Sequence, residues 1–498
     1  MHRPAFPPLA GILAALWLAA SACAADSFNT ASLAITIPGV VLGSTLYTNV
    51  VATLGQVLAV GGGQPYGTCD SYDPVTNQLT IPAVQVNGTT YANVLITVGT
   101  VSQVGGRVAG GAATCSAPAR NVLPMVVDQG PTALKITGVT ATNEPFVSVT
   151  VCVPGSATAC QTIDHVLVDT GSVGLRVIAS ALPNNVLGAL PQELGSGGYG
   201  LSECVQFASN ASWGSVRLAD VQLAGETAGS IPIQIIGDPA VPPVPSACSN
   251  GTVVEDTVAS FGANGVLGVQ PFLQDCGISC VLTAEQGYWM YWICPGGACQ
   301  TAPVGTSQQL PNPVAMLAQD NNGVVLTLPS VPGGMALSVT GTLTLGIATA
   351  ADNALGRATV YDLDPNTGNF TTLFNGQYYT DGAFVDSGSN ALYFADGYLT
   401  PCSSTGSASG FYCPSGTVAL SAYNQGYSNG NSGTVAFSVA NAEALFTTAP
   451  ADAAFSQLAG SPIPGYFDWG LPFFFGNSVF LAFDQSYTAA GPGPYVAY

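Results

Sequence analysis

Residues 163–172 read IDHVLVDTGS, and residues 382–389 read GAFVDSGS. In both stretches a short apolar strand runs into an aspartate, which is followed by Thr or Ser, then Gly, then Ser. A single tetrapeptide of this kind makes a good β-turn and carries little further information. Two copies more than two hundred positions apart, each followed by another apolar run, indicate a fold built from two similar halves.

An apolar stretch that contains glycine follows each copy. Residues 264–269 read NGVLGV, and residues 471–477 read LPFFFGN, with VFLAFD following at residues 479–484. Glycine at such a position lets two backbones approach closely, because a Cβ atom would hold them apart. Each stretch is therefore a candidate partner for the aspartate turn that precedes it.

The composition of the chain indicates an all-β protein. The 498 residues include 60 Gly and 35 Pro, and 48% of the residues are hydrophobic. Short runs rich in Val, Ile and Thr recur between clusters of Gly, Asn and Pro, while long helical heptads are absent. This pattern is typical of many short strands joined by turns.

Taken together, the two aspartate turns and the two glycine stretches resemble the pepsin-like aspartic proteases. In that family an Asp-Thr/Ser-Gly turn interlocks with an apolar-apolar-Gly strand in each of two lobes. The run GTLTLG at residues 341–346 resembles the strand that closes the family's N-terminal lobe. The resemblance implies a bilobal fold, with an N-terminal lobe over residues 143–347, a C-terminal lobe over residues 348–498, and a cleft between them.

The same resemblance implies a catalytic pair formed by Asp169 and Asp386. Two carboxylates about 3 Å apart cannot both ionise cheaply, so such a pair shares one proton. The ionised partner can take a proton from water as the water attacks a peptide carbonyl, and the protonated partner can donate to the carbonyl oxygen. This chemistry needs neither a metal nor a cofactor. The residues expected to support the pair are Thr170, Gly171, Ser172, Ser387, Gly388 and Ser389.

The family also has a hairpin, the flap, that covers the cleft and carries a tyrosine. In this chain the matching stretch is CVQFASNASWG at residues 204–214, which puts Phe207 at the tyrosine position. The tryptophan that usually bonds that tyrosine is also missing, and Arg176 stands near its place. We expect Arg176 to be an exposed side chain beside a core Phe207. The substitutions indicate either a differently built flap or a cleft that no longer cuts peptides.

His165 lies four residues before Asp169 on the same predicted strand. Alternation with period two places both side chains on one face. We expect a structural histidine, because the proposed chemistry needs no imidazole.

The charge of the chain excludes nucleic acid as a partner. Seven Lys and Arg oppose 27 Asp and Glu, which gives a formal net charge of −20. Binding to nucleic acid needs a basic stripe that displaces counterions, and the sequence has none.

The first 24 residues are predicted to be an export signal, either an ordinary signal peptide or a lipoprotein signal. Arg3 supplies the positive start, and the apolar stretch from Leu9 to Ala22 is too short to span a bilayer comfortably. Cys23 is a candidate lipid anchor. We expect no transmembrane span and a location in the periplasm, at the cell surface or outside the cell, with an outer-membrane lipoprotein as one form.

The cysteines indicate disulfides, as expected in an oxidising compartment. Twelve of the 13 cysteines remain once Cys23 is set aside. Zinc is a weak alternative, because no CxxC occurs and the only histidines are His2 and His165. The close pairs are Cys152 with Cys160, Cys276 with Cys280, Cys294 with Cys299, and Cys402 with Cys413. The looser assignments are Cys69 with Cys115 and Cys204 with Cys248.

The N-terminal part contains an internal repeat. The segment that starts at Ile37-Pro38 recurs 44 residues later at Ile81-Pro82, with matching Tyr, Asn, Val and Gly positions. Each copy reads as two strands joined by a turn, at Gly43 and at Asn87-Gly88. We predict a small duplicated β module over residues 26–105 and a linker over residues 106–142.

Three functions stay open at this point. The first is a secreted aspartic endopeptidase that takes a polypeptide substrate in its cleft. The second is a catalytically silent cleft that binds a peptide or a glycan, and the third is a cell-surface structural protein. The chain also resembles a family of exported bacterial proteins of unassigned activity that share the pattern Cys…VDTGS…VDSGSN, and that resemblance supplies no substrate.

Overall fold

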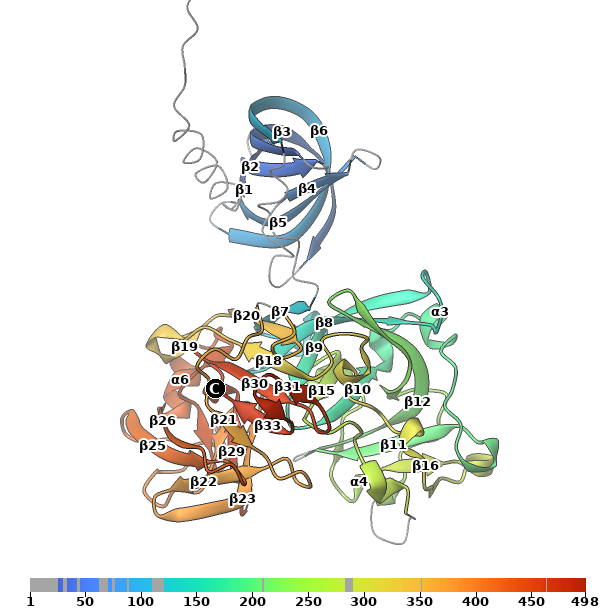
Figure 1. Ribbon diagram of the computed structural model, residues 1–498, viewed down its shortest axis with the longest axis vertical. Helices are drawn as coiled ribbons and strands as arrows, with labels where there is room; N and C mark the ends of the chain where they lie inside the picture. Colours follow the sequence, from blue (N-terminus) through green and yellow to red (C-terminus); the bar gives the residue numbers. More distant parts are fainter. Residues whose placement is uncertain are drawn as a thin grey trace, which may run out of the picture. The chain divides into compact units, whose positions relative to one another are not determined.

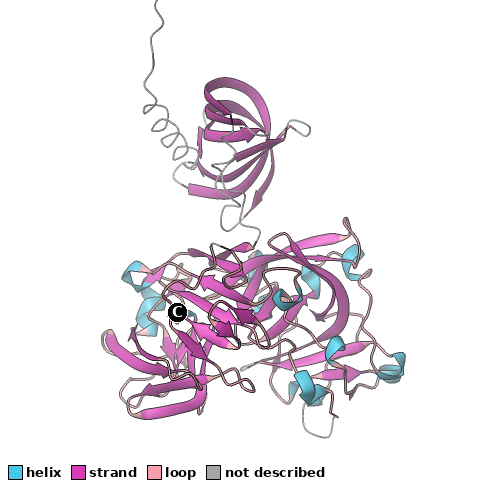
Figure 2. Ribbon diagram, viewed as in Figure 1, coloured by secondary structure: helices cyan, strands magenta, loops and turns pink. Residues whose placement is uncertain are grey.

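The computed structural model describes residues 26–29, 34–42, 45–61, 70–73, 77–86, 89–109, 121–207, 210–282, 290–350, 352–462 and 464–498. The export signal and Cys23 therefore lie outside the described residues. The chain divides into two compact units, Met1–Arg120 and Asn121–Tyr498. Strand dominates in both units, and the helices are short, which confirms the all-β class (Figure 2). None of the helices in the described part of the chain is long and apolar enough to cross a membrane.

The first unit is a single six-stranded sheet whose strands follow the 44-residue repeat. Its strands are β1 (Asp26–Asn29), β2 (Ala34–Leu42), β3 (Thr45–Gly61), β4 (Asp70–Asp73), β5 (Gln78–Val86) and β6 (Thr89–Ala109). Each strand of the second set begins 44 residues after its counterpart in the first. The order is β1-β2-β3-β6-β5-β4, and pairings of β1 with β5 and β2 with β4 close the sheet on itself (Figure 1).

Alternating apolar side chains fill the inside of this sheet. Ile35 and Ile37 of the first copy correspond to Leu79 and Ile81 of the second, and all four are buried. The two expected turns, at residue 43 and at residues 87–88, lie outside the described residues.

The second unit begins earlier than the sequence predicts. Strand β7 (Val122–Val127) pairs with both β8 (Pro145–Cys152) and β20 (Val339–Leu345). The short helix α2 (Thr132–Ile136) follows β7. Residues 122–142 were expected to belong to the linker, but they are part of the second unit.

One long sheet runs through most of the second unit. Its N-terminal part contains β8, β9 (Cys160–Asp169), β10 (Val173–Ile178), β11 (Leu201–Gln206), β12 (Asn210–Leu223), β13 (Glu226–Ile236), β14 (Val253–Val254), β15 (Gly265–Val269), β16 (Tyr291–Ile293) and β17 (Gln300–Thr301). It continues through β7 and β20 into β18 (Gly323–Thr327), β30 (Ser478–Ala482), β33 (Tyr495–Ala497) and β21 (Val360–Asp362). The sheet therefore joins strands from the two ends of the unit.

A seven-stranded sheet, whose strands lie between residues 370 and 470, forms much of the C-terminal half of the second unit. Its order is β26 (Ser432–Val439), β25 (Val418–Gln425), β22 (Phe370–Phe374), β23 (Gln377–Asp386), β29 (Phe467–Gly470), β24 (Leu392–Tyr393) and β28 (Ala459–Gly460). Two small pairs are β19 (Met335–Ala336) with β27 (Ala454–Phe455), and β31 (Tyr487–Thr488) with β32 (Gly491–Pro492). The remaining helices are α3 (Asn184–Leu187), α4 (Ser246–Ser249), α5 (Val258–Phe261) and α6 (Ala442–Thr448).

Five disulfides staple the second unit. The four close cysteine pairs are confirmed, and so is Cys204 with Cys248. This last bond ties β11 to helix α4. Cys69 and Cys115 lie outside the described residues.

The C-terminal half has an aromatic core around Phe467, the first residue of β29. Its ring stacks on Phe394 at 5.1 Å between centroids and packs against Trp469 at 4.6 Å. Phe374 and Tyr379 meet the same ring edge-on. Because Phe467 is completely buried, it fixes β29 against its neighbours.

We predict that Phe467→Ala lowers the free energy of unfolding of the second unit by about 3–5 kcal/mol, because it leaves a cavity in this core. Denaturant unfolding measures the change. Tyr398→Ala is the matched control, since Tyr398 is 92% exposed, and it should change stability by less than about 0.5 kcal/mol. Equal effects of the two substitutions would contradict the prediction.

Candidate active site

Two equivalent strand pairs build the site. β9 ends at Asp169, and β15 lies parallel beside it with Gly268 opposite Asp169. β23 ends at Asp386, and β29 lies parallel beside it with Gly470 opposite Asp386. The aspartate turn of each half thus leaves its strand next to a glycine on a neighbouring strand.

Glycine is required at both positions, because the backbone of a neighbouring segment lies too close to leave room for a Cβ atom. A Cβ on Gly268 would lie 2.7 Å from the carbonyl carbon and oxygen of Ser172, and a Cβ on Gly470 would lie 2.0 Å from the carbonyl oxygen of Ala391. The first glycine falls in the expected stretch. The glycine beside the second turn was expected within residues 471–477, which contain Gly476. This expectation is wrong, because Gly470 lies opposite Asp386.

The physical reason for the error is a carboxylate in the strand. Asp468 precedes Gly470 by two residues and interrupts the apolar pattern that marks such a strand in the sequence. Residues Leu471–Phe473 form a turn of 3₁₀ helix rather than a strand.

Reciprocal hydrogen bonds join the two aspartate turns. The Thr170 hydroxyl donates to the carbonyl oxygen of Val385 at 2.9 Å and accepts from the N–H of Ser387 at 2.9 Å. The Ser387 hydroxyl donates to the carbonyl oxygen of Val168 at 2.7 Å and accepts from the N–H of Thr170 at 3.1 Å. All four bonds are buried, so each turn completes the hydrogen bonding of the other.

Each carboxylate accepts hydrogen bonds from its own turn, from the N–H two residues ahead and the hydroxyl three residues ahead. For Asp169 these donors are Gly171 at 2.7 Å and Ser172 at 2.5 Å, and for Asp386 they are Gly388 at 2.9 Å and Ser389 at 2.9 Å. These bonds fix the orientation of both carboxyl groups. The structure therefore brings all six expected supporting residues together around the two aspartates.

The two carboxyl groups lie against each other's turns. A Cβ on Gly171 would lie 2.7 Å from Cγ of Asp386, and a Cβ on Gly388 would lie 2.7 Å from Oδ1 of Asp169. Burial raises the pKa of Asp386 to about 8, helped by the charge of Asp169 and by a hydrogen bond between the two carboxyl groups. The pair can therefore hold one proton over a wide range of pH.

Both aspartates line a cavity of about 460 Å³. The wall contributed by the N-terminal half combines the apolar side chains of Leu167, Phe207, Phe261 and Val266 with the polar ones of Glu144 and Asn210. The wall contributed by the C-terminal half is polar and includes Ser389, Asn390, Tyr393, Ser461 and Asp468. The two sides of the aspartate pair thus offer different chemistry.

Phe207 lies at the tip of the β11–β12 hairpin and lines the cavity. Its N–H donates to the carbonyl oxygen of Asn210 at 2.9 Å, and its ring packs on Phe261 with centroids 6.1 Å apart. The hairpin thus reaches the cavity, and Phe207 is half-buried there rather than part of the core.

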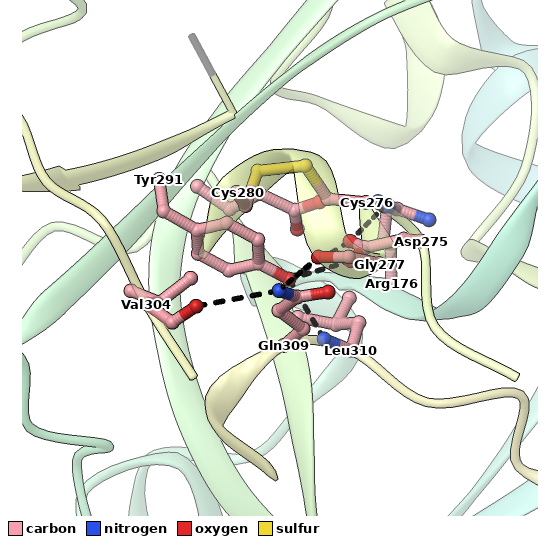
Figure 3. Close-up of a disulfide and its surroundings, with 10 residues drawn as sticks. Arg176, Asp275, Cys276, Gly277, Cys280, Tyr291, Val304, Gln309 and Leu310 are labelled. Atoms are coloured by element: carbon pink, nitrogen blue, oxygen red, sulfur yellow. Dashed lines mark hydrogen bonds and ion pairs between the residues drawn. A yellow bond between two sulfur atoms is a disulfide. The ribbon is translucent and has the colours of Figure 1, made fainter. Parts of the chain in front are cut away.

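Arg176 is buried, with 1% of its surface exposed, so the expected exposed arginine is wrong. Its guanidinium pairs with Glu203 at 2.5 Å and with Asp275 at 3.1 Å. Tyr291 donates to the same Asp275 at 2.8 Å, next to the Cys276–Cys280 disulfide (Figure 3). Two partners far away in sequence compensate the buried charge.

This buried cluster supports the hairpin that carries Phe207. Glu203 belongs to β11, one of the two hairpin strands, so its bond to Arg176 ties the hairpin to β10. Burial raises the pKa of Asp275, and the nearby charge of Glu203 raises it further.

His165 lies outside the cavity lining and pairs with two other aspartates. Its ring nitrogens lie 3.0 Å from Asp164 and 3.3 Å from Asp128. Burial opposes a charge on the ring, but these aspartates outweigh it and raise the pKa of His165 to about 9. Its positive φ of 46° accompanies a bulge between β8 and β9, which breaks the expected alternation with Asp169.

Two further carboxyl groups line the cavity, and both were missed in the sequence. Asp468 is 1% exposed, and burial together with the charge of Asp386 raises its pKa well above the usual range. Burial raises the pKa of Glu144 to about 8, with a contribution from Glu255. The position of Asp468, two residues before Gly470, is a signal that could have identified it as a residue of the site. Nothing in the sequence identifies Glu144 as a residue of the site.

No group of three or more His, Cys, Asp or Glu side chains among the described residues is arranged to hold a metal ion.

Residues 117–498 match the family model described as "Protein of unknown function (DUF3443)". The chain belongs to this family. The match covers more than three quarters of the chain and includes the whole second unit with both aspartate turns, whereas the six-stranded first unit lies outside it. No curated protein matches the sequence.

We predict that this DUF3443 protein is more stable at pH 5 than at pH 8, because two buried carboxyl groups of the site have raised pKa values in the folded protein. Asp386 and Glu144 keep their protons up to about pH 8 in the folded protein, but release them near pH 4 when the chain is unfolded. Their contribution to stability is therefore complete below about pH 4 and is lost as the pH rises through 8. Asp128 and Asp164 have lowered pKa values and act in the opposite sense, at lower pH.

We expect Asp386→Asn to raise the free energy of unfolding at pH 8 by about 2–5 kcal/mol and to change it little at pH 4. Thermal unfolding at the two pH values measures the difference. Asp256→Asn, at an exposed carboxylate outside the cavity lining, is the control and should leave both values unchanged. A loss of stability at pH 8 in Asp386→Asn would contradict the expected repulsion.

Proposed function

We propose that this protein is an aspartic-type endopeptidase with a pepsin-like, bilobal fold. The observation that carries the proposal is the placement of the Asp169 and Asp386 carboxyl groups, each against the turn of the other, at the wall of a cavity. The reciprocal bonds of Thr170 and Ser387 support it, because they hold the two carboxyl groups in one fixed arrangement.

The proposed reaction is the addition of water to a peptide bond. Asp169 takes a proton from water as the water oxygen bonds to the carbonyl carbon, and Asp386 gives its proton to the carbonyl oxygen. In the second step the C–N bond breaks. The amide nitrogen takes the proton held by Asp169, one hydroxyl of the intermediate returns a proton to Asp386, and the pair regains its starting state.

The environment of each aspartate supports this division of labour. The pKa of Asp386 is about 8, so this group carries the proton at acidic and neutral pH. The hydrogen bond that the Ser172 hydroxyl donates to Asp169, 2.5 Å long, orients this carboxyl group for the role of proton acceptor.

A second candidate is a silent cleft that binds a peptide or a glycan without cutting it. The observation that favours this candidate is Phe207, which has no hydroxyl at the tip of the hairpin. Arg176 with Glu203 secures the hairpin instead, at a distance from the cavity lining. The third candidate, a structural protein at the cell surface, rests on the repeat, the low charge and the disulfide content.

The disulfides are consistent with an exported protein. We propose a location in the periplasm or at the cell surface, with Cys23 as a candidate lipid anchor.

We predict cleavage of denatured protein substrates between pH 3 and pH 7. Asp169→Asn and Asp386→Asn should each reduce the rate by at least about a hundredfold, because each removes one proton-transfer partner. Mass spectrometry of the products measures cleavage, and Asp256→Asn serves as the matched control. Equal activity in the wild type and in both site variants would rule out the proposal, and binding without cleavage would support the second candidate.

A further inference from the structure

The two halves of the site differ at one pair of equivalent positions. Val266 lies two residues before Gly268 and pairs with Leu167 of β9. Asp468 lies two residues before Gly470 and pairs with Phe384 of β23. Both Val266 and Asp468 line the cavity. One half therefore presents a methyl-bearing side chain where the other presents a carboxyl group.

The carboxyl group of Asp468 has no hydrogen-bond partner. Both of its oxygens are buried, and neither receives a hydrogen bond from the protein. The Ser389 hydroxyl lies near enough to lower the pKa of Asp468, but its hydrogen bond goes to Asp386. Buried carboxyl groups are normally paired or hydrogen-bonded, because leaving them without partners is costly. Asp468 is thus a polar group at the cavity wall that lacks its complement.

The ionisable groups that line the cavity are nearly all acidic. Four carboxyl groups line it, those of Glu144, Asp169, Asp386 and Asp468, and none of the described lining residues is basic. The pair of Asp169 and Asp386 is satisfied by its own turns, whereas Oε2 of Glu144 also lacks a hydrogen-bond partner. A positively charged group on a ligand would complement this wall.

We propose that Asp468 selects a substrate with a lysine or arginine side chain on the C-terminal-half side of the aspartate pair. The opposite wall takes an apolar side chain on Leu167, Phe207, Phe261 and Val266, which lie beside Glu144 and Asn210. Cleavage then falls between an apolar residue and a basic residue. This inference rests on the proposed peptidase function and adds the class of substrate. On binding, the ammonium or guanidinium donates hydrogen bonds to Asp468, and the proton that Asp468 held leaves to solvent.

The test uses a peptide set that differs at one position. A soluble peptide carries one phenylalanine followed by lysine, by norleucine or by acetyl-lysine, so that chain length is kept while the charge is removed. We expect kcat/KM for the lysine peptide to exceed that for the norleucine peptide by at least tenfold. A second set with the two residues reversed shows on which side of the cleaved bond the basic residue lies.

The decisive variants change Asp468 alone. Asp468→Asn keeps the shape of the side chain and should reduce the lysine preference to less than about twofold while the norleucine peptide is still cut. Asp468→Val copies the residue of the other half and should favour norleucine. A lysine preference that persists in both variants, or is absent from the wild type while peptides are cut, would overturn the inference.

A binding measurement separates this inference from the peptidase proposal. Fluorescence anisotropy with labelled peptides and the Asp169→Asn variant needs no cleavage. In the Asp169→Asn variant, we expect the lysine peptide to bind at least tenfold more tightly than the norleucine peptide. The double variant that carries both Asp169→Asn and Asp468→Asn should lose this difference. If no peptide is cut but the difference in binding is present, the peptidase proposal fails and the specificity of Asp468 stands. Equal binding of all three peptides would refute the role of Asp468.

Discussion

The structure of the site depends on the exchange of hydrogen bonds between Thr170 and Ser387. Each hydroxyl donates to a carbonyl of the opposite strand end and accepts from the N–H of the opposite turn. Each polar group in this exchange is satisfied only when the two halves are in register, so an error in packing would leave buried groups without partners. The same contact places the two aspartates side by side, and the glycines of the turns leave room for the carboxyl groups.

Electrostatics gives this rigid arrangement its chemical character. The cavity collects carboxyl groups without a basic residue among its described lining, so burial and mutual repulsion favour protonated forms. The overall charge of the chain, −20, also favours protonation of the carboxyl groups, because each proton that is bound reduces the repulsion among the negative charges of the protein. Arg176 provides the contrast: it is buried with two carboxylate partners and fixes the hairpin rather than the cavity.

The sequence was sufficient to predict the elements that repeat. The two aspartate turns, the period of the first unit and the disulfides could be inferred because each appears as a pattern in the chain. Gly470 and Asp468 escaped because a buried carboxylate breaks the apolar signal of its strand. The burial of Arg176 could not be predicted, since its partners Glu203 and Asp275 meet it only in the folded sheet.

The central claim is that the carboxyl groups of Asp169 and Asp386 share a proton. The most direct measurement is a ¹³C NMR titration of the labelled aspartate carboxyl carbons in the wild type and in Asp169→Asn. The account predicts one carboxyl that titrates near pH 8 in the wild type, assigned to Asp386, and a lower pKa for the same group once the charge of Asp169 is removed. Titration of both aspartates near pH 4 in the wild type, or a pKa of Asp386 that Asp169→Asn leaves unchanged, would contradict it.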